Sequence, residues 1–305
     1  MSKGEFALID WIRRQIAADP AVAPIGSGDD MAGLNVAGKG LVLVTADLLL
    51  DGVHFDTATA TLRQIGYKAM ACSLSDAAAM AALPHSAVVS VALPRNWTMD
   101  QAKELALGLL DAADRYACPL VGGDVTSWGE PLAVNVALMA TESGVTPVRR
   151  GGARPGDAIL VTGELGGSLA SGRHLTFTPR VAEARTLAQR VRLHAMIDLS
   201  DGLSSDLNHL CDESGVGCLV QAELLPVSDA ARATRDPVAA ALDDGEDFEL
   251  CFTCDDDEAD RLLADPPVAV RLTRIGRITA GPDRLLAHAG GRTEPLTPHG
   301  YEHFR

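Results

Sequence analysis

Apolar residues in the first half of the chain switch between a helical spacing and the dense runs typical of strands. Helical spacing occurs in FALIDWIRRQIA (residues 6–17), TLRQIGYKAMACSLSDAAAMAA (61–82) and MDQAKELALGLLDAADRYA (99–117). Strand-like runs occur at GLVLVTADLLL (40–50), SAVVSVALP (86–94), PLVGGD (119–124) and LAVNVALMAT (132–141). This order predicts a domain of helices and strands with its own core.

The pattern breaks at residues 143–157, SGVTPVRRGGARPGD, which are rich in Gly, Pro and Arg. Such a composition suits a linker or a functional loop between domains. Further elements are predicted after it, at AILVTG (158–163), TPRVAEARTLAQRV (178–191), AMIDLSD (195–201), GCLVQAELLP (217–226) and EDFELCFTC (246–254). Because 305 residues is long for a single core, we expect two domains.

Composition narrows the possible partners. The formal net charge of −15 disfavours nucleic acid and anionic membranes, which attract clustered Lys and Arg. No apolar stretch reaches the length of a membrane span, and the first residues, MSKGEFALIDWIRR, lack the uncharged apolar core of a signal peptide. We therefore expect a cytoplasmic protein that binds neither nucleic acid nor membrane.

The six cysteines do not indicate a disulfide framework, which is rare in cytosolic proteins. The one CxxC motif, Cys251 to Cys254, also reads as the end of a buried strand. A zinc site would want a second pair at ligand spacing, whereas Cys211 and Cys218 are separated by six residues. Structural thiols are therefore favoured over metal ligands.

Aspartates gather where apolar runs end, usually beside Gly, Ser or Thr. The five clusters are Asp29 with Asp30, then Asp47, Asp76, Asp124, and Asp198 with Asp201. Strand ends bring side chains to a common edge of a sheet, where so many carboxylates repel one another unless they share divalent cations. Mg²⁺ prefers such hard oxygen ligands and bridges carboxylates to phosphates. Scattered turn aspartates remain the alternative, because Asp is a common turn residue.

The segment AMIDLSDGLSSDL (195–207) allows both a helix cap and a cation site. Ser200 or Asp201 can cap a helix on which Leu203, Leu207 and Leu210 recur at helical spacing. A strand that ends at Asp198 and a helix that begins near Asp201 would place two carboxylates and Ser200 beside a positive helix terminus. We expect Asp198 and Asp201 to belong to the site and leave Asp206 to solvent or structure.

Common phosphate-binding motifs are absent from the sequence. There is no GxxxxGK[ST], and neither HRD nor DFG of the protein kinases occurs. Any nucleotide is therefore held by a different cradle.

The motifs taken together resemble the thiamine-monophosphate kinases, a family in the superfamily of aminoimidazole ribonucleotide synthetase. They are GEF (4–6), GDD (28–30), TADLLLDGVHF (45–55), YKAMACSLSDAAAM (67–80), GGD (122–124), RRGGARPGD (149–157), IDLSDGLSSDL (197–207), GEDFELCF (245–252) and GYEHF (300–304). Their order and spacing over nearly the whole chain carry the resemblance.

The resemblance implies ATP-dependent phosphorylation of thiamine monophosphate to thiamine diphosphate, with several Mg²⁺ ions and ATP as co-substrate. It implies two α+β domains, residues 1–145 binding ATP and metal and residues 146–305 completing the nucleotide and substrate site. It also implies a homodimer whose N-terminal sheets meet across the two-fold axis. We expect direct in-line transfer, without a covalent or general-base residue, because the acceptor phosphate is already anionic.

The resemblance also implies roles for individual residues. The implied metal ligands are Asp30, Thr45, Ala46, Asp47, Asp76, Asp124, Asp198 and Asp201. The implied ATP contacts are Tyr116, Gly123, Asp124, Arg150 and Ser200. The implied thiamine-side contacts are His54, Glu246 and Tyr301, of which the Tyr301 ring suits a cationic thiazolium. Without the resemblance, Tyr301 would read as an aromatic residue that packs the C-terminus on the core.

Three stretches depart from the family pattern. Ala46 replaces a usual Ser or Thr, so only its carbonyl remains as a ligand, or water takes its place. GGDVTSW (122–128) lacks an arginine that is often present. LGGSLASGRHL (165–175) differs from the commoner form, and there Arg173 or His174 either compensates or belongs to a solvated surface pair. An enzyme like aminoimidazole ribonucleotide synthetase, or a catalytically silent ATP-binding scaffold, remains the alternative.

Overall fold

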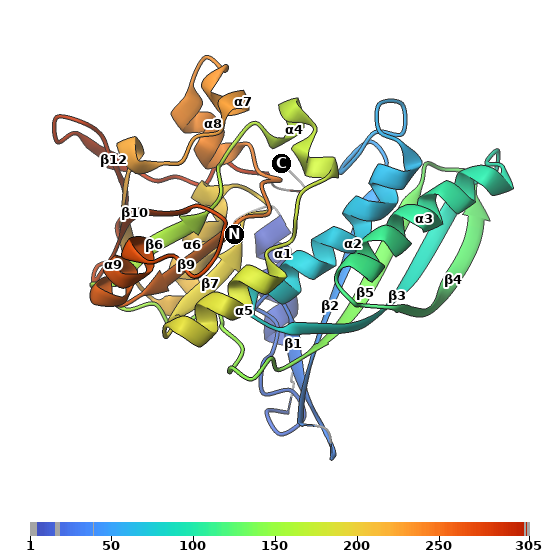
Figure 1. Ribbon diagram of the computed structural model, residues 1–305, viewed down its shortest axis with the longest axis horizontal. Helices are drawn as coiled ribbons and strands as arrows, with labels where there is room; N and C mark the ends of the chain where they lie inside the picture. The colour runs from blue at the N-terminus through green and yellow to red at the C-terminus, as the bar shows by residue number, and fades with distance from the viewer. Residues whose placement is uncertain (1–4, 16–18, 39, 302, 304–305) are drawn as a thin grey trace.

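Two β-sheets and the helices packed on them form the computed structural model of the protein (Figure 1). The structure describes residues 5–15, 19–38, 40–301 and 303. Gly4 of the GEF motif, and Glu302 and Phe304 of the GYEHF motif, lie outside the described residues.

The first sheet has five strands in the order β1-β2-β5-β3-β4. The strands are β1 (Ala32–Val36), β2 (Gly40–Leu50), β3 (Leu83–Pro94), β4 (Leu120–Trp128) and β5 (Ala133–Thr141). Helices α2 (Leu62–Ala79) and α3 (Met99–Arg115) lie side by side on one face, and β4 forms an outer edge (Figure 1).

The second sheet has seven strands in the order β12-β11-β8-β10-β6-β9-β7. The strands are β6 (Ala158–Thr162), β7 (Ala195–Asp198), β8 (Gly217–Gln221), β9 (Leu250–Cys254), β10 (Leu272–Thr279), β11 (Arg284–Ala287) and β12 (Thr293–Pro295). The remaining α-helices are α1 (Glu5–Gln15), α4 (Ser168–Ser171), α5 (Val181–Arg190), α6 (Leu203–Ser214), α7 (Asp229–Arg232), α8 (Pro237–Asp243) and α9 (Asp256–Ala264). The expectation of two α+β domains is confirmed.

Helix α2 is the element that both halves of the molecule share. Its N-terminus is closed by a capping box, in which Thr61 and Gln64 bond each other's backbone N–H. A Cβ on Gly66 would lie 2.1 Å from the Leu105 carbonyl oxygen, so glycine allows α3 to approach closely. The helix also contacts α5 and β7 of the second half. Small and apolar residues therefore predominate in α2 because the helix is buried on several sides. Polar residues on this helix lie where it packs against other elements.

The predicted elements occur in the structure, but several of their ends differ: β3 begins at Leu83, before the predicted residue 86, and β4 continues to Trp128, beyond the predicted residue 124. Two other strands are shorter than predicted. The segment 217–226 is strand only as far as Gln221, and the segment 246–254 becomes strand only at Leu250. The second difference has a physical cause, because Glu246 and Phe248 have left-handed backbone angles, with φ of 57° and 49°, that a strand cannot contain. All six cysteines are free thiols, as expected.

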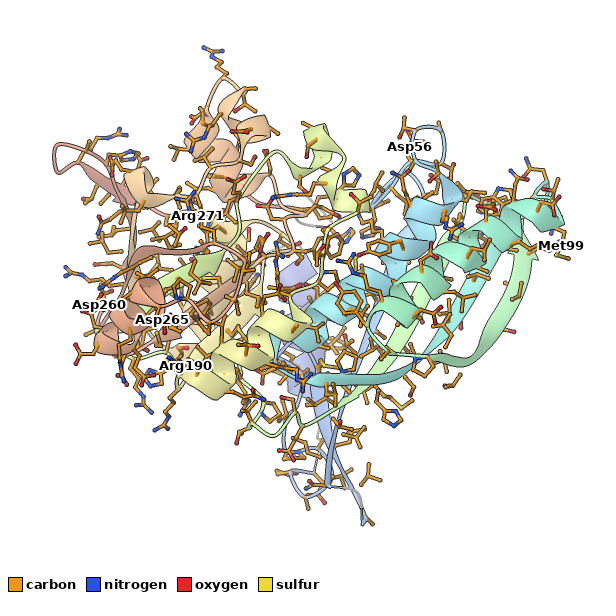
Figure 2. All side chains as sticks on the ribbon, viewed as in Figure 1. Asp56, Met99, Arg190, Asp260, Asp265 and Arg271 are labelled. Carbon is orange, nitrogen blue, oxygen red and sulfur yellow. The ribbon has the colours of Figure 1, made fainter. Side chains whose placement is uncertain are left out.

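Charged side chains cover the outside of the second half. Arg190, Asp260 and Asp265 lie on its outer side, and Asp56 lies on the loop after β2 (Figure 2). Arg190 and Asp265 form an exposed ion pair of 3.4 Å, of the kind that contributes little stability. Within the described ranges, no helix has both the length and the apolar character that crossing a membrane requires.

Candidate active site

Three aspartates from distant parts of the chain meet between the two sheets. Asp30 precedes β1, Asp76 lies near the end of α2, and Asp198 ends β7. One carboxylate oxygen of each lies within 4.8 Å of the others. The predicted gathering of aspartates therefore occurs for these three, but only Asp198 lies at the end of a strand.

Asp47 joins this group from strand β2. Its side chain faces α2, where the Ser73 hydroxyl donates a hydrogen bond of 2.6 Å to Asp47 Oδ2. Thr45, two residues earlier on the same face, donates to Asp76 Oδ2. Ala46 lies between them with its side chain exposed on the opposite face. Of the Ala46 atoms, only the carbonyl oxygen is a possible metal ligand.

The electrostatics of this carboxylate cluster (Asp30, Asp47, Asp76 and Asp198) require positive charge. Burial, followed by repulsion from Asp30, raises the pKa of Asp198 to about 7, although the Ser75 hydroxyl opposes this. Burial likewise raises the pKa of Asp76 well above its ordinary value, with Asp47 next in importance. The Arg150 guanidinium supplies part of the missing charge, since its Nη2 lies 2.6 Å from Asp30 Oδ1.

The cluster fits divalent cations of the hard type. Asp30 Oδ2 is buried and has no hydrogen-bond partner among the residues that the structure describes, which is unusual for a carboxylate oxygen. All the donors are oxygens, as Mg²⁺ prefers, and no His or Cys belongs to the cluster. A cation there would satisfy Asp30 Oδ2 and reduce the repulsion among the four carboxylates.

The turn after β7 corrects one expectation and refines another. Helix α6 begins at Leu203, and neither Ser200 nor Asp201 caps it, because Gly202 with φ of 112° occupies that position. Asp206 is buried and accepts hydrogen bonds of 3.1 Å from the backbone N–H groups of Asp201 and Gly202. Asp206 is therefore structural rather than solvated, and it shapes the turn that presents Ser200 and Asp201.

A cavity of about 260 Å³ lies next to the carboxylate cluster. Asp47, Ser200 and Asp201 line it on the side of the cluster. The three predicted thiamine-side residues also line it, together with one lysine; these are His54, Lys68, Glu246 and Tyr301. The structure thus brings metal-side and substrate-side candidates into one cavity.

His54 is held as a neutral ring in the cavity wall. Its Nδ1 accepts a hydrogen bond of 3.1 Å from the Leu50 N–H, which leaves the proton of the neutral ring on Nε2. Burial, followed by the charge of Lys68, lowers the pKa of His54 to about 4. His54 therefore offers an N–H donor and no positive charge near pH 7.

Tyr301 comes to the cavity from the C-terminal segment. Its backbone N–H donates a 3.1 Å hydrogen bond to the Asp201 carbonyl, and a Cβ on Gly300 would lie 2.1 Å from that same oxygen. The Tyr301 ring is half-exposed and meets the His303 ring edge-on at 4.8 Å. The tyrosine is therefore tied to the metal-side turn and is not anchored in the core.

Asp124 does not reach the cluster within one chain. Asp124 lies on β4 and pairs with Ser90 of β3. Ser90 pairs with Asn135 of β5, which in turn pairs with Leu48 of β2, so these four residues form one row across the sheet. Asp47 belongs to the adjacent row, so the two side chains point to opposite faces. Three strand spacings of about 4.8 Å put β4 roughly 14 Å from β2. Asp124 is exposed there.

Gly123 and Tyr116 also lie outside the cavity. A Cβ on Gly123 would lie 1.9 Å from the Val89 carbonyl oxygen, so packing against β3 alone requires glycine. Tyr116 ends α3, and its hydroxyl donates a 3.1 Å hydrogen bond to the Pro179 carbonyl. Both positions have structural explanations, and their predicted contacts with ATP stay predictions.

Several residues of the site were not identified from the sequence. Ser73 and Ser75 bond Asp47 and Asp198, and Lys68 lies in the cavity wall. One sequence feature could have indicated all three. Each is a charged or hydroxyl residue in the segment 61–82, where small and apolar residues predominate and most side chains are buried.

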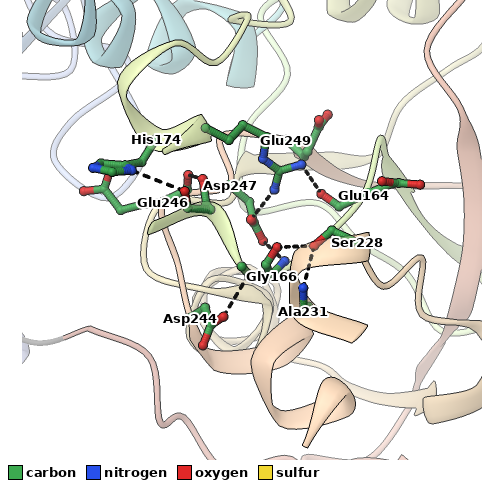
Figure 3. A network of polar contacts seen from close by, with 12 residues as sticks. Glu164, Gly166, His174, Ser228, Ala231, Asp244, Glu246, Asp247 and Glu249 are labelled. Atoms are coloured by element: carbon green, nitrogen blue, oxygen red, sulfur yellow. Dashed lines mark hydrogen bonds and ion pairs between the residues drawn. The ribbon is translucent and has the colours of Figure 1, made fainter. Parts of the chain in front are cut away.

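The divergent segment 165–175 is joined to its surroundings by an ion pair and by contacts with backbone carbonyls. Arg173 Nη2 pairs with Asp247 Oδ1 at 2.5 Å, and Arg173 Nη1 donates to the Glu164 carbonyl (Figure 3). His174 Nδ1 lies 3.2 Å from the Ser168 carbonyl oxygen. Neither side chain is a solvated surface group, and Arg173 joins this segment to the turn that contains Asp247.

A second group of possible ligands lies elsewhere, at Asp157, His194 and Asp255. Asp157 Oδ2 already accepts from the Arg154 N–H and lies 2.8 Å from His194 Nδ1. His194 Nε2 is 3.8 Å from the exposed Asp255. This arrangement is that of a buried histidine oriented by carboxylates, and it offers too few uncommitted donors for a metal.

Two family models match the chain. The model for the N-terminal domain of AIR synthase related proteins matches residues 28–145, and the model for their C-terminal domain matches residues 154–286. A solved structure of hydrogenase maturation protein HypE shares the fold, with a TM-score of 0.71 at 19% identity over 92% of this chain and 94% of that one. The fold and the site therefore define an AIR synthase related protein.

Full-length relatives narrow this class. Thiamine-monophosphate kinase of Rhodopirellula baltica is 38% identical over 98% of this chain and 97% of its own length, and that of Escherichia coli is 34% identical over 100% and 99%. The solved structure of AaThiL complexed with AMPPCP and TMP has a TM-score of 0.83 at 30% identity, covering 99% of this chain and 97% of that one. The chain belongs to the thiamine-monophosphate kinase family.

Proposed function

We propose that this protein transfers the γ-phosphoryl group of ATP to the phosphate of thiamine monophosphate, which yields thiamine diphosphate and ADP. The observation that carries the proposal is the single cavity that joins Asp47, Ser200 and Asp201 to His54, Glu246 and Tyr301. The complex of AaThiL with AMPPCP and TMP supports ATP and thiamine monophosphate as the two substrates. The family relationship favours this reaction over that of an aminoimidazole ribonucleotide synthetase or the role of a silent scaffold.

Asp30, Asp47, Asp76 and Asp198 are proposed to hold Mg²⁺, with Thr45, the Ala46 carbonyl and Asp201 as further candidates. When bound, Mg²⁺ supplies charge neutralisation for two phosphate groups that must approach each other. The hydroxyls of Ser73 and Ser75 orient the carboxylates of Asp47 and Asp198. Such contacts behind the ligands keep each carboxylate in one orientation.

The reaction needs no general base on this chain. The acceptor is a phosphate monoester, which is anionic near pH 7 and attacks the γ-phosphorus while the bond to the ADP oxygen breaks. The protein therefore contributes positioning and charge. Arg150, beside Asp30, is proposed to contact the triphosphate, and Ser200 is proposed to contact the nucleotide from the turn after β7.

His54, Glu246 and Tyr301 are proposed to bind the thiamine side of the substrate. His54 presents an Nε2–H donor, as its bond from the Leu50 N–H requires. The ring of Tyr301 suits the cationic thiazolium, because a π face attracts a cation. His54 is an orienting group in this scheme and not a nucleophile.

We propose that the protein is a homodimer that uses the outer edge of its first sheet. Strand β4 is exposed over almost its whole length, and Val121 and Val125 on it are 61% and 71% exposed. A long exposed edge strand that carries such apolar side chains invites pairing with another strand. If Asp124 binds metal, it does so in the site of the partner copy, because its own cluster lies on the other face of the sheet.

Three further expectations stand as proposals beside this function. The boundary between the domains is placed between residues 145 and 146, within the linker before the pair Arg149 and Arg150. Both arginines bond Asp29, so the linker is fixed to the first domain. We also propose that Tyr116 and Gly123 contact ATP and that the protein acts in the cytoplasm.

A product assay tests the function. Pure protein is incubated with ATP and Mg²⁺, together with either thiamine monophosphate or formylglycinamidine ribonucleotide, and the products are separated by chromatography. Thiamine diphosphate with the first substrate is the expected result. ADP formed only with the second substrate would favour the synthetase instead, and nucleotide binding with neither product would favour the scaffold.

A further inference from the structure

Lys68 is a charged residue in a place where charges are costly. Its side chain is only 1% exposed, although it lies in the middle of helix α2. Its ammonium nitrogen lies 2.5 Å from Glu246 Oε2 and 2.5 Å from the His54 carbonyl oxygen. A buried ammonium group persists only when it is paired and hydrogen-bonded, and both conditions are met here.

The two partners of Lys68 lie in different halves of the molecule. His54 follows β2 of the first sheet, and Glu246 precedes β9 of the second, 178 residues from Lys68 in sequence. All three residues line the same cavity. One lysine therefore connects two of the proposed thiamine-side groups across the boundary between the sheets.

The backbone of Glu246 is held by contacts that do not involve Lys68. The Glu246 N–H donates a 2.7 Å hydrogen bond to the Ser200 carbonyl, and the Glu246 carbonyl accepts one of 2.5 Å from the Ser168 hydroxyl. The left-handed angle of Glu246 is unfavourable for a residue with a side chain and persists because these contacts hold it. Figure 3 shows Glu246 beside the contacts that hold Asp247 and Gly166. Only the side chain of Glu246 retains freedom, and Lys68 holds one of its two oxygens.

We propose that Lys68 is a positioning residue for substrate binding, which holds the Glu246 carboxylate and the His54 backbone at a fixed separation across the cavity. The pair engages Oε2 of Glu246, so the other carboxylate oxygen is the one left for the substrate. This inference rests on the proposed function, because it assigns the support of the same thiamine-side groups.

The charge of Lys68 predicts a pH dependence of the KM for thiamine monophosphate that a purely structural role of the side chain would not produce. The titratable groups that face it are His54, Cys72, His174 and Glu246. Burial raises the pKa of Glu246, and Lys68 lowers it. Without Lys68 the carboxyl group takes up a proton at higher pH, so the KM for thiamine monophosphate rises more steeply than in the wild type as the pH falls below neutrality.

The experiment compares steady-state kinetics of the full-length wild-type protein with those of five variants. They are Lys68→Met, Lys68→Arg, Glu246→Gln, the double variant Lys68→Met/Glu246→Gln, and Lys103→Met as a control for the loss of an exposed lysine. Lys68→Met is expected to raise the KM for thiamine monophosphate about 10-fold or more, with kcat and the KM for ATP changed less than about 3-fold. Lys68→Arg is expected to recover part of the loss. The double variant is expected to be no worse than Lys68→Met and to lack the additional rise of the KM at low pH.

Three outcomes decide between the claims. Thiamine diphosphate formation by the wild type, together with an unchanged KM in Lys68→Met, overturns the inference and leaves the proposed function standing. Absence of product with the wild type overturns the proposed function and the inference that rests on it. If Lys68→Met does not fold, Glu246→Gln tests the pair from its other side, and an unchanged KM for thiamine monophosphate in that variant overturns the inference.

Discussion

The hydroxyl of Ser75 donates a hydrogen bond of 2.5 Å to Asp198 Oδ2, and this bond joins helix α2 to the end of strand β7. Both residues are buried. The bond stabilises the charged form of a carboxyl group whose pKa burial raises to about 7. The contact therefore links the two halves of the molecule at the carboxylate cluster.

Ser75→Ala is expected to weaken both stability and activity. Asp198 would lose a buried hydrogen bond, which costs about 1–3 kcal/mol of unfolding free energy, and kcat/KM should fall about 10- to 100-fold, as for other contacts that orient metal ligands. Urea unfolding and steady-state kinetics measure the two effects. Thr297→Ala, which removes an exposed hydroxyl, is the control, and equal behaviour of the two variants would contradict the role of Ser75.

Asp47→Asn is expected to remove activity and leave a folded protein. The substitution keeps the shape of the side chain and its bond from Ser73 but removes one negative charge from the cluster. We expect kcat to fall by about 10²-fold or more at saturating Mg²⁺, with circular dichroism unchanged. Turnover near that of the wild type would contradict the assignment of the cluster as the metal site.

Mixed dimers test whether Asp124 acts in the partner copy. Asp47→Asn and Asp124→Asn are each expected to be inactive as homodimers. If Asp124 serves the neighbouring site, one of the two sites in a mixed dimer carries neither substitution. Refolding the two variants together should then restore about a quarter of wild-type activity, given random pairing of two-fold dimers. No recovery, with mixed dimers confirmed by mass spectrometry, argues against this arrangement.

His54→Ala is expected to affect substrate binding more than turnover. The neutral ring donates from Nε2 and carries no charge near pH 7, so its loss removes binding interactions without removing a proton-transfer step. We predict that the KM for thiamine monophosphate rises about 10-fold and that kcat falls less than about 5-fold. Complete loss of kcat in a folded variant would instead indicate a catalytic histidine.

The lowered pKa of His54 predicts that the free energy of unfolding depends on pH. Its pKa is lowered from 6.5 to about 4 in the folded protein, first by burial and then by Lys68. Between these pH values the unfolded chain binds more protons at this position, so the free energy of unfolding falls as the pH falls. His54→Asn should flatten this part of the curve. Urea unfolding at about pH 7 and about pH 5 measures the difference, and identical slopes in both proteins would contradict the prediction.

The spacing of apolar residues predicted those helices and strands that are buried in the same way along their whole length. The strand at 40–50 has the bounds expected from its apolar run, and the helix at 61–82 was evident from its spacing. The aspartates at the ends of such elements could be predicted to converge, because elements end at sheet edges. Asp198 at the end of β7 fits this reason, whereas Asp30 before β1 and Asp76 on helix α2 reach it through the docking of the two halves.

The features that could not be predicted from the sequence depend on contacts between residues that are far apart in the chain. The bond between Lys68 and Glu246 depends on how two halves of the chain dock, and the left-handed turn at Glu246 depends on bonds from Ser200 and Ser168. The position of Asp124 depends on strand order, which places β4 three strands from β2. None of these relationships leaves a periodic signal in the sequence.

Direct transfer of the γ-phosphoryl group to thiamine monophosphate is tested most directly by a single-turnover experiment. Excess protein is mixed with Mg²⁺, thiamine monophosphate and ATP radiolabelled in its γ-phosphate, and the label is followed in protein and small molecules over time. We predict that the label passes from ATP to thiamine diphosphate without appearing on the protein. Label bound to the protein before product forms, or released only as inorganic phosphate, would contradict the account.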